Sequence, residues 1–171
     1  MKTKYLLLGV VALGLLSCEK IRNEGKIWDI APVVYIVQVV DAKGIDLLNP
    51  ENSGSFKVND IKALYGGKEY DCIAIDTTRP PTKAYLPRFF GLKVEKNIFR
   101  GNYLLHFGEL EGAKSYSNEE LTIFWGDGSS DIIKFNRKFR WKLNGDPEIS
   151  EEWFLNGAKV SGSGRVITIV K

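Results

Sequence analysis

The sequence predicts an all-β fold, an antiparallel β-sandwich of immunoglobulin-like type with about nine short strands and no major helix. Three observations support this prediction. Apolar residues alternate with polar ones or form short β-branched runs, without the period of a helix. Turn signals containing Gly, Asn or Pro recur roughly every 8–12 residues, and two pairs of runs flank glycine-containing turns typical of hairpins. This spacing favours a sandwich over a barrel.

The first 17 residues have the features of a secretory signal peptide. Two lysines precede an apolar run that ends at Leu16, and the small residue Ser17 follows. The apolar run has about 12 residues, well short of the ~20 that a helix needs to cross a bilayer. The Cys18 that comes next is similar to the lipobox cysteine of bacterial lipoproteins. That resemblance implies that residues 1–17 are removed and that Cys18 carries a diacylglyceryl group.

Residues 18–30 are polar and mixed in charge, and we expect them to be the lipidated N-terminus and a flexible tether, followed by a single domain from 31 to 171. Removal of residues 1–17 takes away two lysines and no acid, so 22 basic residues face 21 acidic ones, a net charge of +1. No long basic cluster is present, so nucleic acid is not an expected partner. Once Cys18 is lipidated, Cys72 has no cysteine partner, and the fold must depend on its core.

The first half of the domain contains a central strand and a hairpin. Residues 33–40 form a nearly unbroken β-branched run, typical of a strand buried in a sheet. Two alternating runs, 61–65 and 70–74, surround Gly66-Gly67, and both glycines can adopt the positive φ of a hairpin turn. Residues 77–87 hold three of the six prolines and are predicted to be a connection between sheets.

The second half of the domain is predicted to contain a second hairpin and several further strands. Residues 121–125 and 131–135 are alternating runs on either side of the turn Gly126-Asp127-Gly128-Ser129-Ser130. Residues 109–118 are interpreted as a polar loop. The remaining predicted strands are 91–95, 103–107, 139–143, 152–155 and 165–170.

Several of these stretches together resemble small lipoproteins that are common in Bacteroidetes. The resemblance rests on the lipobox at Cys18, residues 41–50, Trp125-Gly126-Asp127-Gly128 and Phe154-Leu155-Asn156-Gly157. It implies a β-sandwich attached to the outer membrane, and it supplies no catalytic residues. The Trp-Gly-Asp-Gly-Ser stretch also looks like the turn motif of PKD-type immunoglobulin-like modules, in which Asp-Gly is chiefly structural.

The sequence offers no catalytic constellation, so we expect neither catalytic residues nor a cofactor. His106 is the only histidine, and it lies in a predicted strand, where a lone histidine is usually a surface or edge residue. Cys72 alternates with Tyr70 and Ala74, which indicates a small buried hydrophobe rather than a nucleophile. No G-x-S-x-G motif is present.

Carboxylates form weak candidate cation sites. Asp127, Ser129 and Asp131 are spaced by two, which superficially resembles a calcium loop, but the final bidentate Glu of an EF-hand is absent. Asp-Gly is also a favoured hairpin turn, and we favour that interpretation. A second oxygen-rich loop, equally weak, contains Asp41, Asp46, Asn49 and Asn52.

Aromatic residues make up 12% of the chain and suggest an exposed binding patch. Trp125 and Trp153 each have a phenylalanine neighbour, and adjacent strand residues point to opposite faces. An exposed aromatic patch would mark an interaction site, and we name Trp125 and Trp153 as its candidates.

These observations favour a non-catalytic, lipid-anchored module of the cell envelope that binds a glycan or a protein partner. The predicted membrane contact is the lipid on Cys18, at the outer membrane, with the domain periplasmic or surface-facing. Two alternatives remain open: a glycan hydrolase that uses paired carboxylates, and a structural subunit that pairs an exposed edge strand at 33–40 or 165–170 with a partner strand.

Overall fold

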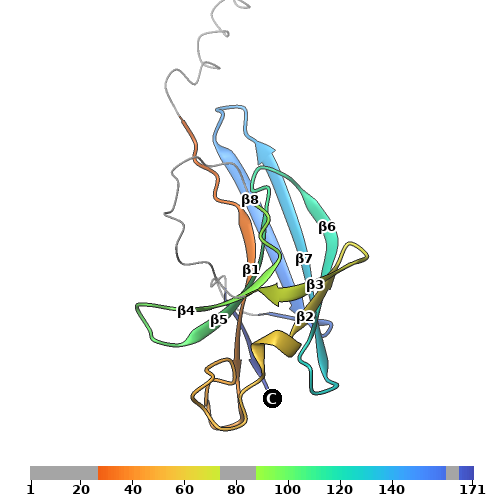
Figure 1. The fold of residues 1–171 in the computed structure, drawn as a ribbon. Helices are drawn as coiled ribbons and strands as arrows, with labels where there is room; N and C mark the ends of the chain where they lie inside the picture. The colour runs from red at the N-terminus through yellow and green to blue at the C-terminus, as the bar shows by residue number, and fades with distance from the viewer. Residues whose placement is uncertain (1–26, 74–87, 161–165) are drawn as a thin grey trace, which may run out of the picture.

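The computed structural model describes residues 27–73, 88–160 and 166–171, and in this part of the chain the protein is all-β (Figure 1). Ten strands form the fold, and one three-residue 3-10 helix, η2 (Val58–Asp60), follows a loop after the first strand. None of the described residues forms a helix that is long and apolar enough to span a bilayer. The strands are β1 (Val33–Val40), β2 (Lys62–Tyr65), β3 (Lys68–Ile73), β4 (Leu92–Lys96), β5 (Tyr103–Leu110), β6 (Tyr116–Phe124), β7 (Ser130–Trp141), β8 (Pro147–Leu155), β9 (Ala158–Lys159) and β10 (Val166–Val170).

The strands form one mixed sheet that curls into a half-barrel, so the predicted immunoglobulin-like antiparallel sandwich is wrong. The order of the strands is β10-β1-β5-β4-β3-β2-β6-β7-β8-β9. Two of the neighbouring pairs are parallel, β1 with β10 and β3 with β4, and the others are antiparallel. The all-β class and the absence of a major helix in the described residues are confirmed.

Strand β3 is the reason that two separate layers do not form. Its residues Lys68 to Asp71 pair with β2, while Cys72 and Ile73 pair with Leu92 and Lys93 of β4. One strand therefore continues the hydrogen-bonded ladder from one arm of the sheet to the other. Local alternation does not encode which strands become neighbours, and this is why the sequence pattern suggested two sheets.

Both predicted hairpins are present. Gly66 and Gly67 connect β2 to β3 with φ of 57° and 77°, and the turn between β6 and β7 contains Gly126 and Gly128 with φ of 82° and 89°. The predicted strand at 139–143 is not separate, because β7 continues without a break from Ser130 to Trp141 and pairs with β8 from Ile133 to Trp141. The sequence also missed β9, which has only two residues.

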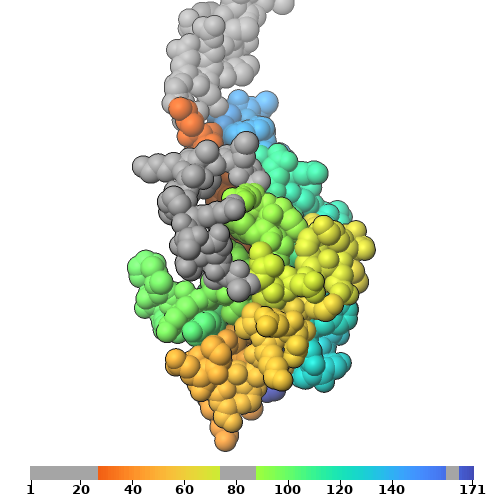
Figure 2. Space-filling model, viewed as in Figure 1, coloured from red at the N-terminus to blue at the C-terminus, as the bar shows by residue number. Residues whose placement is uncertain are grey.

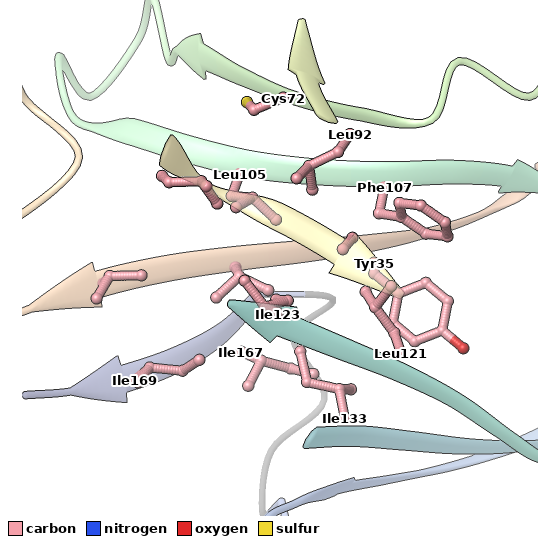
Figure 3. Close-up of a cluster of buried hydrophobic side chains, with 14 of the residues drawn as sticks. Tyr35, Cys72, Leu92, Leu105, Phe107, Leu121, Ile123, Ile133, Ile167 and Ile169 are labelled. Carbon is pink, nitrogen blue, oxygen red and sulfur yellow. The ribbon is translucent and has the colours of Figure 1, made fainter. Parts of the chain in front are cut away.

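The core lies on the concave face of the curled sheet (Figure 3). Alternate residues of β1 point into it, and Tyr35, Val37 and Val39 are fully buried. The opposite arm contributes Leu121 and Ile123 from β6 and further apolar residues from β7. The Tyr35 ring packs against aromatic rings from both arms of the sheet, those of Tyr65, Phe107, Phe135 and Trp153.

The half-barrel has two ends, and we name them from the direction of β1. The start end contains residues 27–32, the β5–β6 loop and the β7–β8 turn. The far end contains the last residues of β1 and β10, the β6–β7 turn and the β4–β5 turn. Strand β1 has eight residues, so the two ends are separated by roughly 25 Å or more.

Several predictions fall outside the described residues. The signal peptide at 1–17, Cys18, most of the tether at 18–30 and the proline-rich connection at 77–87 are in the ranges that the structure does not describe. Residues 27–30 are described and contain no strand or helix.

Candidate functional site

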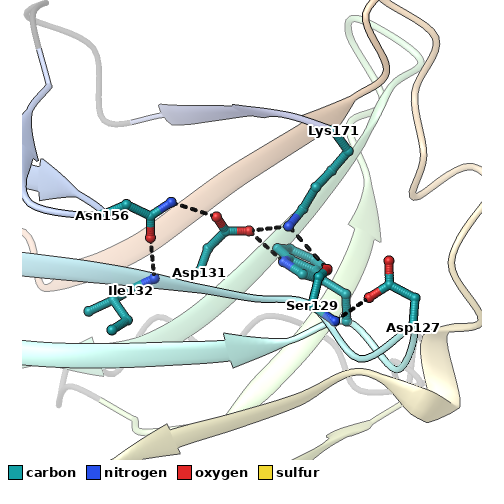
Figure 4. A network of polar contacts seen from close by, with 7 residues as sticks. Asp127, Ser129, Asp131, Ile132, Asn156 and Lys171 are labelled. Atoms are coloured by element: carbon teal, nitrogen blue, oxygen red, sulfur yellow. Dashed lines mark hydrogen bonds and ion pairs between the residues drawn. The ribbon is translucent and has the colours of Figure 1, made fainter.

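A buried polar network at the far end joins β7, β10 and the turn after β8 (Figure 4). The Asp131 carboxylate accepts a hydrogen bond from Trp125 Nε1 at 2.7 Å and another from Asn156 Nδ2 at 2.7 Å. Lys171 Nζ forms an ion pair with the same carboxylate at 2.6 Å. Asn156 Oδ1 also accepts the backbone N–H of Ile132, so this network fixes the far end of the half-barrel.

The charge of Asp131 is stabilised by its donors. Burial alone raises the pKa of this carboxyl group, but the bonds from Lys171, Asn156 and Trp125 outweigh it, and the net effect lowers the pKa. A carboxylate with one cation and two neutral donors has little capacity left for a metal ion.

Asp127 and Ser129 serve the β6–β7 turn rather than a cation site. Asp127 Oδ1 accepts the backbone N–H of Ser129 at 2.8 Å, an Asx turn, and the pKa of Asp127 is lowered by the hydrogen bonds from Ser129. The structure therefore places Asp127 in the turn and Asp131 in the buried network (Figure 4). Among the described residues, no group of three or more His, Cys, Asp or Glu side chains could hold a metal ion.

The second oxygen-rich loop also uses its side chains to hold its own backbone. Asp41 Oδ1 accepts the N–H groups of Lys43 and Ile45, both at 2.8 Å. Asp46 accepts the N–H of Leu48 at 2.9 Å and that of Tyr103 at 2.7 Å. The contact to Tyr103 attaches this loop to the start of β5.

The predicted exposed aromatic patch at Trp125 and Trp153 is wrong. Trp125 is 1% exposed, and it stacks on Phe56 with ring centroids 5.2 Å apart. Trp153 is partly buried and stacks on Phe135 at 4.4 Å. The predicted alternation holds, because Phe124 is the neighbour that faces outward. Sequence alternation does not show which way either tryptophan points, since it leaves open which of the two faces is the core.

His106 and Cys72 have no catalytic setting among the described residues. His106 is half-buried in β5, between Ile36 of β1 and Lys93 of β4, so it is not on an edge strand. Burial lowers the pKa of its imidazole. Cys72 is buried, as predicted, and burial raises the pKa of its thiol to about 11, which disfavours a thiolate nucleophile.

The β4–β5 turn, residues 97–102, presents the most exposed pair of adjacent apolar side chains in the described chain. Ile98 is 84% exposed and Phe99 is 92% exposed. In Figure 2 this hairpin projects from the body in green. We name Ile98 and Phe99 the apolar turn.

The backbone of this turn is held rigidly. Asn97 Oδ1 accepts the N–H groups of Phe99 at 3.0 Å and Arg100 at 3.2 Å. Asn97 N–H donates to Asn102 O, and Gly101 N–H donates to Asn97 O, both at 2.7 Å. Gly101 has a φ of 75°, which favours glycine. This site was not predicted from the sequence. Its signal in the sequence is an apolar pair, Ile98 and Phe99, between two turn-forming residues, Asn97 and Gly101.

A surface pocket of about 400 Å³ lies at the start end and contains two carboxylates, those of Asp29 and Glu151. Glu151 forms an ion pair with Arg137, whose other nitrogen donates to the carbonyl of Gly112. The pair therefore ties β7 and β8 to the β5–β6 loop. This structural use gives no support to the hydrolase alternative.

Strand β10 is an edge strand in the described structure, where it pairs with β1. By contrast, residues 33–40, the other candidate for an exposed edge strand, are not at an edge, because β1 lies between β10 and β5. Val166, Thr168 and Val170 of β10 are exposed on its outer face.

Comparisons of the chain with protein-family models, with curated proteins and with solved structures return no match.

Proposed function

We propose that this protein is a non-catalytic, lipid-anchored module of the cell envelope that binds a protein partner through the apolar turn. The single observation that carries the proposal is the rigid presentation of Ile98 and Phe99, at 84% and 92% exposure. Large apolar side chains that stand in water contribute little to folding, and because hydrogen bonds already order the backbone of this turn, a partner that covers them pays little for ordering the loop.

The chemistry of the apolar turn favours a protein over a glycan. Sugar recognition uses the flat face of an aromatic ring with hydrogen-bonding groups around it. Phe99 supplies one such ring, but half of the exposed apolar surface belongs to Ile98, which is aliphatic and has no face for stacking. The flanking side chains of Lys96 and Arg100 are basic and exposed. We therefore expect an apolar pocket with an acidic rim on the partner.

The position of the apolar turn suits an anchored protein. It lies at the far end, whereas residues 27–32, which follow the predicted tether, lie at the start end. A lipid on Cys18 would hold the start end at the membrane and leave the apolar turn accessible to a partner.

The direct test is a comparison of two matched double variants of the lipidated full chain. Ile98→Ser/Phe99→Ser removes the apolar turn, and Trp141→Ser/Leu143→Ser removes an exposed apolar pair on another hairpin turn. Partner proteins are captured from membranes of the native cells, and their affinities for the purified variants are then measured. Burial of two such side chains is worth about 3 kcal/mol or more, so we expect at least a roughly 100-fold weaker affinity for the first variant only.

Two results would overturn the proposal. One is a captured partner that binds Ile98→Ser/Phe99→Ser as tightly as the wild type. The other is a glycan ligand whose binding is unchanged by this double variant.

A second candidate function is supported by the edge position of β10. A partner strand that added to β10 would make this protein a structural subunit. Thr168→Pro would block the ladder on an added strand, because proline has no N–H group to donate. Loss of assembly in this variant, with the apolar turn intact, would favour the second candidate.

A further inference from the structure

A second exposed apolar surface lies at the start end, on the turn between β7 and β8. Trp141 is 53% exposed and Leu143 is 93% exposed, and we name these two residues the hairpin tip. The backbone of the turn is ordered by bonds from Lys142 N–H to Asp146 O at 2.9 Å and from Gly145 N–H to Lys142 O at 2.8 Å. The tip is therefore presented in a fixed geometry.

The beginning of the described chain is fixed against the same hairpin. Trp28 and Ile30 line a pocket with Pro147 and Ile149 of β8. The segment also passes so close to Gly112 that a Cβ there would lie 2.1 Å from the carbonyl oxygen of Ala31. Figure 2 shows these first residues, in orange, beside the β7–β8 turn, in blue.

More apolar side chains extend the surface around the hairpin tip. Ile27 is 96% exposed, Trp28 is 45% exposed and Ile149 is 43% exposed. On the tip, Lys142 lies between Trp141 and Leu143, and Arg140 forms an ion pair with Glu148. Aromatic and aliphatic side chains with an interspersed lysine are the composition that suits the boundary between lipid head groups and acyl chains.

The length of the chain before Ile27 limits how far this surface can lie from the predicted lipid. Eight residues, 19–26, lie between Cys18 and Ile27. Such a segment spans roughly 16 Å when flexible and at most about 30 Å when extended. A lipid on Cys18 therefore keeps the start end within a tether length of the bilayer surface.

We propose that the hairpin tip docks on the lipid bilayer that holds the N-terminal lipid, with Trp141 and Leu143 at the boundary between head groups and acyl chains. This inference rests on the lipid tether of the proposed function and goes beyond it. The tether and the tip are two contacts at one end, and together they fix the orientation of the molecule. The apolar turn, which projects sideways from the body, is then held away from the bilayer (Figure 2).

The test uses an environment-sensitive fluorophore at two matched positions of the lipidated full chain. Lys142→Cys places the label on the hairpin tip, and Arg100→Cys places it beside the apolar turn. Both replace an exposed basic residue next to an exposed apolar one. Cys72 is buried with a thiol pKa of about 11, so the introduced cysteine reacts selectively.

Each labelled protein is incorporated into vesicles of phosphatidylethanolamine and phosphatidylglycerol, with and without lipids that carry a spin label on the acyl chain. We expect the label at 142 to shift to shorter wavelength and to be quenched by the spin-labelled lipid. The label at 100 is expected to keep its emission in water. Adding Trp141→Ser/Leu143→Ser to the first protein is expected to abolish both effects.

The outcomes separate this inference from the proposed function. If the protein floats with the vesicles but the label at 142 stays in water, the tether stands and the docking of the tip is overturned. Equal quenching at 142 and 100 also overturns it, since the molecule would lie flat. A shift at 142 without quenching also overturns it, because protein and not lipid would then cover the tip. If the lipidated chain does not float with the vesicles, the tether itself fails and the docking fails with it.

Discussion

Asp131 shows how one buried charge is made compatible with the interior of this protein. Its side chain is 7% exposed, and each of its oxygens accepts at least one hydrogen bond. The ion pair with Lys171 connects the last residue of the chain to β7. Removal of the carboxylate would leave a half-buried ammonium group and two side-chain donors without their acceptor, which costs more than the pair itself contributes.

We expect Asp131→Asn to lower the free energy of unfolding by about 2–3 kcal/mol at pH 7. Thermal or urea unfolding of the variant measures this loss. Asp127→Asn is the matched control, because Asp127 is exposed and serves the same turn. The account would be contradicted if the two variants lost the same stability.

The pH dependence of the same variant follows from the direction of the pKa shift. The folded protein holds the pKa of Asp131 below its ordinary value, so the native state favours the charged form. The contribution of the Asp131 carboxylate to the free energy of unfolding is therefore complete above the pKa that Asp131 has in the unfolded chain, about 4. This contribution is lost as the pH falls through the lower pKa that Asp131 has in the folded protein. The stability difference between wild type and Asp131→Asn should narrow in acid below about pH 4.

At the scale of the element, the β6–β7 turn contains two positions that require glycine for different reasons. Both have positive φ, 82° for Gly126 and 89° for Gly128. A Cβ on Gly126 would lie 2.5 Å from the Cβ of Asp60 and 3.0 Å from its carbonyl oxygen. A Cβ on Gly128 would meet nothing within 4 Å. The first glycine allows η2 to approach the turn, and the second only allows the turn conformation.

We therefore expect Gly126→Ala to cost more stability than Gly128→Ala. The backbone conformation alone costs each variant roughly 1–2 kcal/mol. Gly126→Ala must in addition displace the backbone of η2, which costs about 1–3 kcal/mol more. Urea unfolding of the two variants measures the difference, and equal losses would show that the contact with Asp60 is unimportant.

The local elements were the part of the fold that could be predicted from sequence. Residues 33–40 became β1, and Gly66-Gly67 became a hairpin turn, because β-branching and positive-φ turns are properties of a few neighbouring residues. The prediction of a separate strand at 139–143 is wrong, because β7 continues through residues 136–141 and the alternation at 139–143 is part of the same strand pattern. Within the site, the turn roles of Asp127 and Ser129 could be predicted, but the burial of Trp125 could not.

At the scale of the whole molecule, the curl of the sheet decides which residues meet. Lys171 reaches Asp131 because the sheet brings the edge strand β10 back toward β7, although many strands separate the two in the sheet order. Such contacts depend on sheet order and twist, and neither is encoded by alternation within one strand. This is why the sequence predicted the strands and not their assembly.

The curled sheet also gives the molecule two different ends. The hairpin tip lies beside the first described residues, and the apolar turn lies at the far end. Each end exposes a pair of large apolar side chains on a hydrogen-bonded turn. The proposed roles of these ends, a membrane contact and a partner contact, are compatible because roughly 25 Å or more of strand separates them.

The most direct measurement of the central claim is site-specific photo-crosslinking in the native cells, with the photoreactive residue at position 99 or at position 143. The account predicts a discrete protein adduct from position 99, which Ile98→Ser removes or strongly weakens, and no protein adduct from position 143. A protein adduct from position 143 together with none from position 99 would contradict the account, because the partner would then bind the end assigned to the membrane.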